Sequence, residues 1–512
     1  AYRAGAIGQI GDIQSGNTIS DYSAEEIARQ SSINLSIVPI EWDNCKINLI
    51  DVPGTFDFVG ETEAALSVCE SALIICPSYA GISAGTKQAM YKARNKGKII
   101  YINGLDNPNS DYPTKLQQLK DTYGKGIAPI QVPIMDKMVG YVNVVKMEGR
   151  MFEDGQTHEA PIPEDMMDEV LPIKAMIDEA VANTSDELLE KYLEEEPFTK
   201  EEISNALRQG VTDGSLIPVL CGTDRIGISI ILNSMCAFFD SANHPKNALI
   251  VKDLKKDDEK ILECNEDSPT SLFVFKTITD PFVGKTSYFK VTSGTLYAGM
   301  TLYNPKEKED EKIVKIYQPM GKNLIEVDKL HAGEIGAFTR STTCHTNDTL
   351  CDPRSPILIP DTEYSKPYYK KAIVPLGKSN EEKIANAINR LLEEDPTLVY
   401  EYNEETKQQC LSGIGDIHLD TVLNKLKARF KVEAKFEDVK IPYRETIKKE
   451  VTQRTRYKKQ SGGHGQFGEV EITFKPSRDY DKPYIFKEEV FGGAVPRTYF
   501  PAVEKGLIES VK

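Results

Sequence analysis

The sequence predicts a multidomain α/β protein, and three observations carry that prediction. The chain has 512 residues, which is more than one ordinary hydrophobic core can organise. Residues 2–222 alternate short apolar runs with helical patterns, whereas residues 269–351 alternate like strands and carry glycine at their turns. Residues 366–438 then follow the order strand, helix, strand, strand, helix, strand. Several domains in series are therefore expected.

The first expected domain covers residues 1–250 and has four strand-like runs. Short apolar runs of this kind fit strands that are buried on both faces of a parallel sheet. An acidic segment, residues 108–213, separates the last two runs and is expected to be an inserted subdomain, with a helix-capping box beginning at Thr199. The four runs are residues 47–50, 72–76, 98–102 and 216–220.

Three further domains are expected after the first. Residues 255–355 predict a small closed β-barrel, and residues 366–440 predict a ferredoxin-like β-α-β-β-α-β domain. Residues 443–512 begin another α/β domain without completing it. Because the chain opens at Ala1 in mid-pattern and ends inside an apparent helix, we expect a fragment cut at both ends.

Composition indicates a cytoplasmic globular protein. No apolar run approaches the roughly 20 residues that a membrane helix requires, and no secretory leader opens the chain. The nine cysteines include no C-x-x-C pair, which favours reduced thiols, and the six histidines form no metal-ligand cluster. A net charge of −16 excludes nucleic-acid binding by overall attraction, so any RNA contact must be local.

The segment from Lys46 to Phe58 carries the first chemical motif. An apolar strand ends in Asp51, and Pro53 and Gly54 follow at once. A strand end can present the Asp51 carboxylate to a Mg²⁺-bound water, and Gly54, lacking a Cβ, lets a backbone N–H approach a γ-phosphate. The alternative is an ordinary buried strand followed by a Pro-Gly turn.

A guanine reader is predicted at the ends of the next strands. Asn103 and Asp106 follow the run 98–102, and a carboxylate there accepts from guanine N1 and N2, for which adenine offers no matching donors. The segment Cys221-Gly222-Thr223, after the last strand, could contact the base carbonyl. The alternative for Asn103 and Asp106 is an Asx turn without a ligand.

One part of a nucleotide site is missing from the 512 residues. Ser32 could give a second hydroxyl ligand to Mg²⁺, but no G-x-x-x-x-G-K-[ST] phosphate loop occurs anywhere in the chain. Such a loop precedes the Asp51-type motif in these domains, so we expect it before Ala1. Without it, residues 1–512 should bind GTP weakly.

A basic stretch in the last segment is a candidate RNA contact. Tyr457 is interleaved there with basic side chains, although a solvated charged strand is the simpler interpretation of charge alone. The basic residues are Arg454, Arg456, Lys458 and Lys459.

In this order, the motifs resemble those of the elongation factor G family of translational GTPases. Asp51-Val-Pro-Gly-Thr-Phe-Asp57 is similar to the family's Asp-Thr-Pro-Gly-His-Val-Asp, and Val219–Thr223 resembles its base-contacting loop. Glu393–Thr397 and Ser412–His418 resemble signatures of the family's third domain. Gln460–Gly468 and Gly492–Pro496 resemble the opening of its fourth domain.

The resemblance implies a P-loop-NTPase-like GTP-binding domain lacking its phosphate loop, a translation-factor barrel, a ferredoxin-like third domain and the start of a ribosomal-S5-like fourth. It also implies GTP and Mg²⁺ as cofactors, the ribosome as partner with contacts to ribosomal RNA and tRNA, no membrane association and a monomeric state. Within the fourth domain, it places Gly462, Gly463 and His464 at the RNA contact.

Departures from the family pattern predict a divergent paralogue. Thr55 occupies the position of the catalytic histidine that orients the attacking water, so hydrolysis should be impaired. Gly104 replaces the lysine of the guanine motif, and Ser32 replaces the Mg²⁺-contacting threonine. The rival interpretation is a ribosome-binding regulator that does not hydrolyse GTP. A tetracycline-protection relative fits less well, because those proteins usually keep the histidine.

Overall fold

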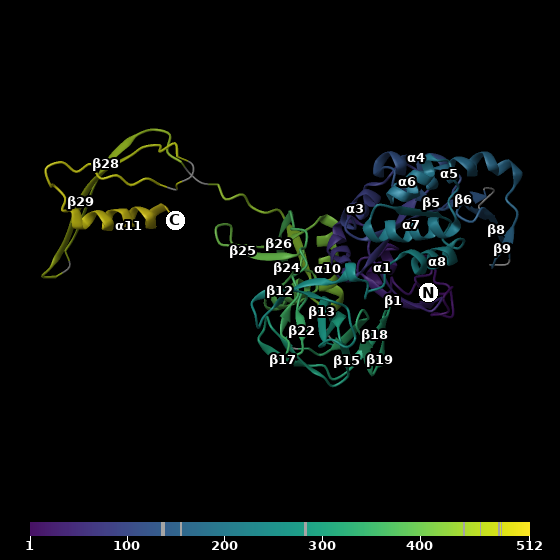
Figure 1. Ribbon diagram of the computed structural model, residues 1–512. Helices are drawn as coiled ribbons and strands as arrows, with labels where there is room; N and C mark the ends of the chain where they lie inside the picture. Colours follow the sequence, from purple (N-terminus) through teal and green to yellow (C-terminus); the bar gives the residue numbers. More distant parts are fainter. Residues whose placement is uncertain are drawn as a thin grey trace. The chain divides into compact units, whose positions relative to one another are not determined.

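The computed structural model describes residues 1–134, 139–153, 156–280, 284–341, 343–443, 446–460, 462–479, 482 and 484–511. The chain divides into two compact units, Ala1–Val439 and Lys440–Lys512, and Figure 1 follows it from purple to yellow. In the part of the chain that is described, no helix combines the length and the apolar character needed to span a bilayer.

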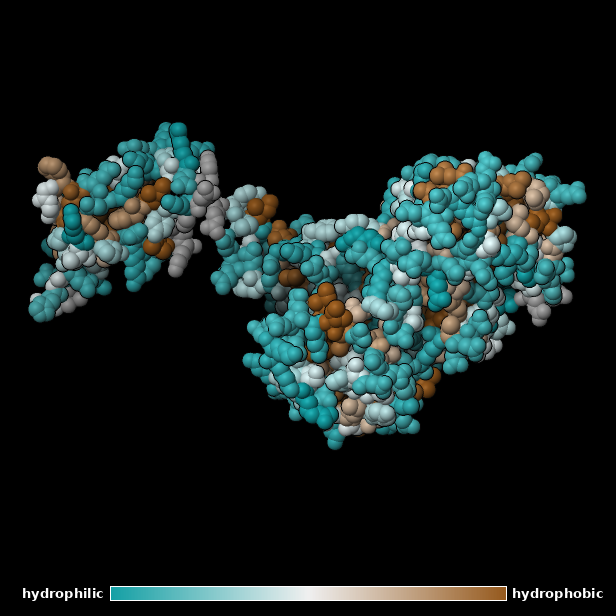
Figure 2. Space-filling model, in the orientation of Figure 1, coloured by the Kyte–Doolittle hydropathy of each residue, from teal (hydrophilic) through white to brown (hydrophobic). Residues whose placement is uncertain are grey.

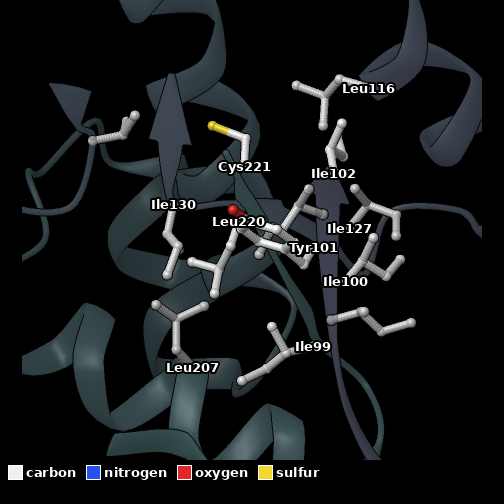
Figure 3. Close-up of a cluster of buried hydrophobic side chains, with 14 of the residues drawn as sticks. Ile99, Ile100, Tyr101, Ile102, Leu116, Ile127, Ile130, Leu207, Leu220 and Cys221 are labelled. Atoms are coloured by element: carbon white, nitrogen blue, oxygen red, sulfur yellow. The ribbon is translucent and has the colours of Figure 1, made fainter. Parts of the chain in front are cut away.

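A parallel four-stranded sheet forms the centre of the first domain. Its strands, in spatial order, are β3 (Ser71–Pro77), β4 (Gly97–Asn103), β10 (Ile217–Cys221) and β5 (Ile127–Pro129). The strands are apolar because they are buried, and Ile99, Ile102 and Leu220 are fully inaccessible to solvent. Figure 3 shows these side chains beside Leu116 and Leu207. The accompanying helices are α2 (Val59–Val68), α3 (Ala84–Lys92), α4 (Tyr112–Tyr123), α7 (Lys200–Asp213) and α8 (Ile228–Phe238).

The strand that ends in Asp51 lies in a separate sheet. It is β2 (Cys45–Asp51), and it pairs antiparallel with β1 (Ser36–Trp42), which follows the short helix α1 (Ala24–Arg29). The expectation that residues 47–50 join the parallel sheet is therefore wrong. Among the described residues, no strand pairs with the outer edge of β2 or of β3, and both strands line one cavity of about 990 Å³.

Residues 108–213, expected as one insertion, contribute to two parts of the structure. Helices α4 and α7 pack on the central sheet, and β5 pairs with β10 inside it. The predicted capping box is present, because the Thr199 hydroxyl accepts from the Glu202 N–H and the Glu202 carboxylate accepts from the Thr199 N–H. The remaining strands form a second, antiparallel sheet of β6 (Gln131–Ile134), β7 (Gly140–Asn143), β8 (Glu148–Glu153) and β9 (Gln156–Ala160). Of the two remaining helices, α5 (Met167–Ala182) packs against β5, and α6 (Asp186–Leu193) packs against α5.

The second domain is the predicted β-barrel domain. Its eight-stranded antiparallel sheet surrounds a core that includes Leu272, Phe289 and Phe338. The sheet has the order β17 (Glu309–Lys312), β16 (Thr301–Asn304), β22 (Thr349–Cys351), β13 (Ser271–Asp280), β14 (Gly284–Ser293), β21 (Ile335–Thr339), β18 (Ile316–Met320) and β19 (Asn323–Val327). Smaller sheets flank it, formed by β11 (Leu249–Asp253), β12 (Asp258–Leu262) and β23 (Ile357–Leu358), and by β15 (Thr295–Tyr297) and β20 (Lys329–His331).

The third domain has the predicted split β-α-β order. Its four strands are arranged in space as β25-β26-β24-β27, and the two helices bury Ile384, Ile388, Leu419 and Leu426 against them. Apolar residues three and four apart on each helix form this buried stripe. The elements in chain order are β24 (Tyr369–Pro375), α9 (Lys378–Glu394), β25 (Val399–Asn403), β26 (Gln408–Gly413), α10 (Asp416–Phe430) and β27 (Ala434–Glu437).

The second unit consists of a long hairpin and a helix. Strands β28 (Val451–Gln460) and β29 (Gly465–Phe474) pair antiparallel along their whole length, and α11 (Phe500–Val511) follows. All ten residues of β28 are exposed. Figure 2 shows apolar side chains, in brown, on the visible surface of this unit, and its exposed apolar residues include Val451, Tyr457, Phe467 and Phe491.

Candidate functional site

Asp51 stands where β2 ends, at the wall of the 990 Å³ cavity. Pro53, Gly54 and Thr55 follow it and line the same cavity. Pro53 is buried and anchors the turn, whereas Gly54 is exposed. A Cβ added to Gly54 would meet no atom of the described residues within 4 Å, so their packing does not require glycine there. The space beside Gly54 is open to a ligand.

The Asp51 carboxylate lies in an acidic environment. It is accessible through the cavity, yet the surrounding protein desolvates it, and this desolvation together with the charges of Asp21 and Glu26 raises its pKa. A hydrogen bond from the Ser20 hydroxyl opposes the shift. Among the described residues, the buried Oδ1 atom of Asp21 has no hydrogen-bond partner. Carboxylate and hydroxyl oxygens are the ligands that Mg²⁺ prefers, so these residues fit a divalent cation.

Ser32, the predicted second Mg²⁺ ligand, occupies a different place. It lies between α1 and β1 and is not among the residues that line the cavity. Ser20 is the hydroxyl that contacts Asp51 instead. Ser20 and Asp21 were missed from the sequence because they lie in an irregular segment before α1, with no strand end or motif to mark them.

Thr55 immediately precedes a short 3₁₀ helix, Phe56–Phe58, that leads into α2. Its side chain does not cap that helix, and Thr55 lines the cavity beside Gly54. The hydroxyl is therefore available to a ligand or a water in the cavity. It carries no group that is protonated and deprotonated near neutral pH, unlike an imidazole.

The predicted base-reading segments meet at the ends of β4 and β10. The Leu105 N–H donates to the Gly222 carbonyl (3.1 Å), and the Gly222 N–H donates to the Ile102 carbonyl (2.9 Å). The Tyr101 hydroxyl, buried beneath them, donates to the Thr223 carbonyl at 2.9 Å. Asp106 is exposed at this edge, whereas Cys221 and Gly222 are buried. The two strands thus bring the two predicted base-site segments, Asn103–Asp106 and Cys221–Thr223, into one cluster.

Gly104 has a structural reason to be glycine. Its φ of +81° lies in the left-handed region, which side chains with a Cβ rarely adopt. Its carbonyl accepts a hydrogen bond from the Ser78 hydroxyl at 2.6 Å. The loop between Asn103 and Asp106 is therefore a tight turn held against the end of β3.

Asp224 joins the base-site cluster and was not predicted. Its Oδ1 atom accepts a hydrogen bond of 2.7 Å from the Nδ2 atom of Asn103. The sequence offers one signal for Asp224, which is an acidic residue three positions after the end of β10 at Cys221.

The two halves of the site lie at the same edge of the fold. Strands β3 and β4 are parallel, and Pro77 is paired with Asn103 at their carboxyl ends. The segment after β3 reaches α3, where a Cβ built on Gly85 would lie 3.8 Å from the Gly54 carbonyl oxygen. The carboxyl ends of β2, β3 and β4 are thus connected, which is where α/β sheets bind ligands.

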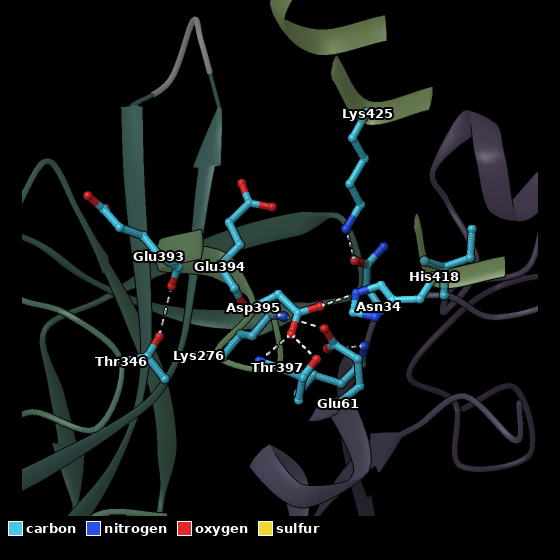
Figure 4. A network of polar contacts seen from close by, with 12 residues as sticks. Asn34, Glu61, Lys276, Thr346, Glu393, Glu394, Asp395, Thr397, His418 and Lys425 are labelled. Carbon is cyan, nitrogen blue, oxygen red and sulfur yellow. Dashed lines mark hydrogen bonds and ion pairs between the residues drawn. The ribbon is translucent and has the colours of Figure 1, made fainter. Parts of the chain in front are cut away.

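Beyond Thr55, the chain contacts the third domain through a buried polar network, shown in Figure 4. The Asp57 carboxylate accepts from the His418 N–H (3.0 Å), and Glu61 of α2 forms an ion pair with Lys276 of β13. Lys276 also donates to the Glu394 carbonyl (3.0 Å). Three domains of the first unit are therefore joined by one ion pair and by hydrogen bonds a few residues from Thr55.

The predicted RNA-contacting residues lie on the hairpin of the second unit. Alternation along β28 places Arg454, Arg456 and Lys458 on one face and Lys459 on the other. Arg454 and Arg456 both pair with Glu469 of β29, at 2.6 and 3.0 Å. Gly462 and Gly463 lie in the exposed turn with His464, and the φ of Gly462 is +94°. Part of the predicted positive charge is therefore neutralised within the hairpin.

Comparison with known proteins agrees with this arrangement. Four protein-family profiles match consecutive parts of the chain: elongation factor Tu GTP binding domain (residues 1–240), elongation factor G domain 2 (269–353), elongation factor G domain III (364–438) and elongation factor G domain IV (439–512). A crystal structure of a protein from Thermus thermophilus has a TM-score of 0.87 and 31% sequence identity, over 99% of this chain and 74% of that chain. From its domains, their order and this likeness, the chain belongs to the elongation factor G family.

Proposed function

We propose that this protein binds GTP with Mg²⁺, docks on the ribosome and couples its nucleotide state to ribosome translocation or remodelling. The single observation that supports this most is the common edge shared by Asp51 and the Asn103–Asp106 turn. A carboxylate for a cation at one end and a carboxylate for guanine at the other match the two ends of a nucleotide.

Specific residues have assigned roles in this proposal. Asp51 holds the Mg²⁺-bound water, Gly54 gives a backbone N–H to the γ-phosphate, and Asp106 accepts from guanine. Asn103, Cys221, Gly222 and Thr223 shape the base site, and Pro53 fixes the turn. The Ser20 hydroxyl, which is hydrogen-bonded to Asp51, and the Asp21 carboxylate supply further oxygen ligands in the role foreseen for Ser32. Bound Mg²⁺ would neutralise the developing charge on the phosphates.

Hydrolysis is proposed to be slow, because Thr55 takes the place of the water-orienting histidine. A hydroxyl can hold a water by a hydrogen bond, but it is shorter than an imidazole and reaches less far into the 990 Å³ cavity. Loss of a positioned general base or orienting group costs about 10²–10⁴-fold in rate.

The experiment is ribosome-stimulated phosphate release from the full-length protein. Thr55→His should raise the ribosome-dependent rate by at least tenfold, because it restores the orienting group. Thr55→Ala is the matched control and should not raise it. A wild-type protein that binds GTP yet shows no turnover above background, with or without Thr55→His, would contradict the enzymatic part.

A second candidate function is ribosome binding without hydrolysis. Thr55 favours it, because the cavity wall offers no imidazole at that place. Under this alternative, the protein holds either GTP or no nucleotide and does not hydrolyse GTP. The fourth domain contacts RNA through the residues of the hairpin, which are Arg454, Arg456, Lys458, Lys459, Gly462, Gly463 and His464. Both candidates act on translating ribosomes, so we propose a cytoplasmic monomer in either case.

A further inference from the structure

The Asn103 side chain has a fixed orientation in this structure. Its Nδ2 atom lies 2.7 Å from Asp224 Oδ1, and an ionised carboxylate can only accept, so the amide nitrogen must face Asp224. Its Oδ1 atom is shielded from solvent and has no partner among the described residues. A shielded acceptor without a partner is unfavourable, because it has lost the hydrogen bonds that water would give it. The Asn103–Asp224 hydrogen bond thus leaves the Oδ1 atom of Asn103 without a partner among the described residues.

Asp224 is held in place by a tight turn. The Thr223 Oγ1 atom accepts from the Arg225 N–H (3.3 Å) and the Ile226 N–H (3.0 Å), and the Thr223 N–H donates to the Ile226 carbonyl (3.0 Å). These bonds are made by the neighbours of Asp224 and not by its own side chain. The Asp224 carboxylate is exposed and can leave Asn103 without unfolding the turn.

Purine chemistry explains why this contact matters. Guanine offers N1 and N2 as donors, which a carboxylate such as Asp106 accepts, and it offers N7 and O6 as acceptors. At the edge of the base site, the Asn103 amide nitrogen is a donor that suits such an acceptor. Asp224 occupies that donor and adds a negative charge beside it.

We propose that Asp224 is a specificity-determining residue that competes with the purine N7 atom for the Asn103 amide. This inference rests on the proposed binding of guanine nucleotides. It predicts a site that recognises guanine mainly through N1 and N2, with little contribution from N7, and that binds more weakly than it would without Asp224.

The test compares GTP with 7-deaza-GTP, in which a C–H replaces N7, as competitors of fluorescent GDP on the full-length protein. Wild-type protein should bind the two with affinities that differ less than twofold. Asp224→Ala should bind GTP about fivefold more tightly, the size of one net hydrogen bond, and should leave the affinity for 7-deaza-GTP unchanged. Asp420→Ala, an exposed carboxylate of α10, is the charge-matched control and should change neither affinity.

The outcomes separate this inference from the proposed function. A wild-type protein that prefers GTP over 7-deaza-GTP by tenfold overturns the role of Asp224, and that measurement needs no variant. The same follows if Asp224→Ala changes both affinities equally. Failure of every guanine nucleotide to displace the probe would instead refute the proposed function itself.

Discussion

At the scale of single residues, two glycines near the candidate site differ in what surrounds them. A Cβ on Gly415 would lie 2.3 Å from Asp57 Oδ1, so any side chain there would push the Asp57 carboxylate out of its contact with the His418 N–H. A Cβ on Gly54 would meet no protein atom within 4 Å. Gly415 is therefore required by the fold, whereas Gly54 has room that only a ligand would fill.

We therefore expect Gly54→Ala to separate stability from nucleotide binding. The thermal midpoint should change by less than about 2 °C, because the added methyl group touches nothing in the protein. The affinity of the full-length protein for a non-hydrolysable GTP analogue should fall at least tenfold, since the methyl group intrudes on the γ-phosphate. Calorimetry and nucleotide titration measure the two effects. Equal GTP-analogue affinity in both proteins would place the γ-phosphate elsewhere.

At the scale of helices and strands, the sequence predicted those elements that a local pattern of apolar residues marks. The runs 72–76, 98–102 and 216–220 are strands of the parallel sheet, because continuous apolar runs mark burial on both faces. Strand β5 has three residues and strand β1 contains Pro39, so neither gives a clear pattern. Which sheet β2 joins is decided by long-range pairing, which no local pattern reports.

The same limit applies to the candidate site. Asp51, Asn103 and Asp106 could be named as candidates from the sequence because each lies at or just after a strand end, where α/β proteins place ligand contacts. Ser20, Asp21 and Asp224 could not, because they come from irregular segments that only the folded chain brings to the site. Asn103 and Asp224 lie 121 positions apart in the sequence, and only the fold brings them within hydrogen-bond distance.

The separation of β2 from the parallel sheet predicts a pattern of amide hydrogen exchange. Alternate N–H groups of β2 point toward β1 and are protected by pairing, while the others point toward the cavity, where no described strand accepts them. We expect the second set to exchange at least a hundredfold faster than the amides of β4, which is paired on both sides. Exchange followed by NMR or by mass spectrometry of residues 1–512 provides the measurement. Uniformly slow exchange along β2 would contradict the open edge.

At the scale of the whole first unit, a buried charge network joins the three domains. Asp395 Oδ2 lies 2.8 Å from His418 Nε2, and Lys276 contributes a positive charge nearby. Burial alone would raise the pKa of Asp395, but the hydrogen bond and charge of His418, together with Lys276, hold it well below its usual range. Asp395 and His418 both belong to the third domain, so the ionised carboxylate mainly stabilises that domain, and Lys276 of the second domain adds a favourable charge from outside it.

This lowered pKa predicts a loss of stability in acid. Above pH ~4, Asp395 is ionised in the folded and unfolded states, and its stabilisation is complete. Below pH ~4 the unfolded state takes up the proton first, so stability falls as pH approaches the lower pKa of the folded state. We expect Asp395→Asn to lose less stability than wild type between pH 5 and 3, by about 1 kcal/mol. Urea unfolding at each pH tests this, and parallel profiles would refute it.

The Arg454–Glu469–Arg456 ion pairs of the second unit affect how strongly this protein would bind a polyanion. A phosphate that meets this cluster finds a net charge of +1, two arginines less one glutamate, so it releases fewer condensed cations than it would on two unpaired arginines. Counterion release drives most non-specific adhesion to nucleic acid, so the hairpin gains little from it. With a net charge of −16, the chain would then bind bulk RNA weakly. Its binding to an RNA surface would depend mainly on the shape of that surface.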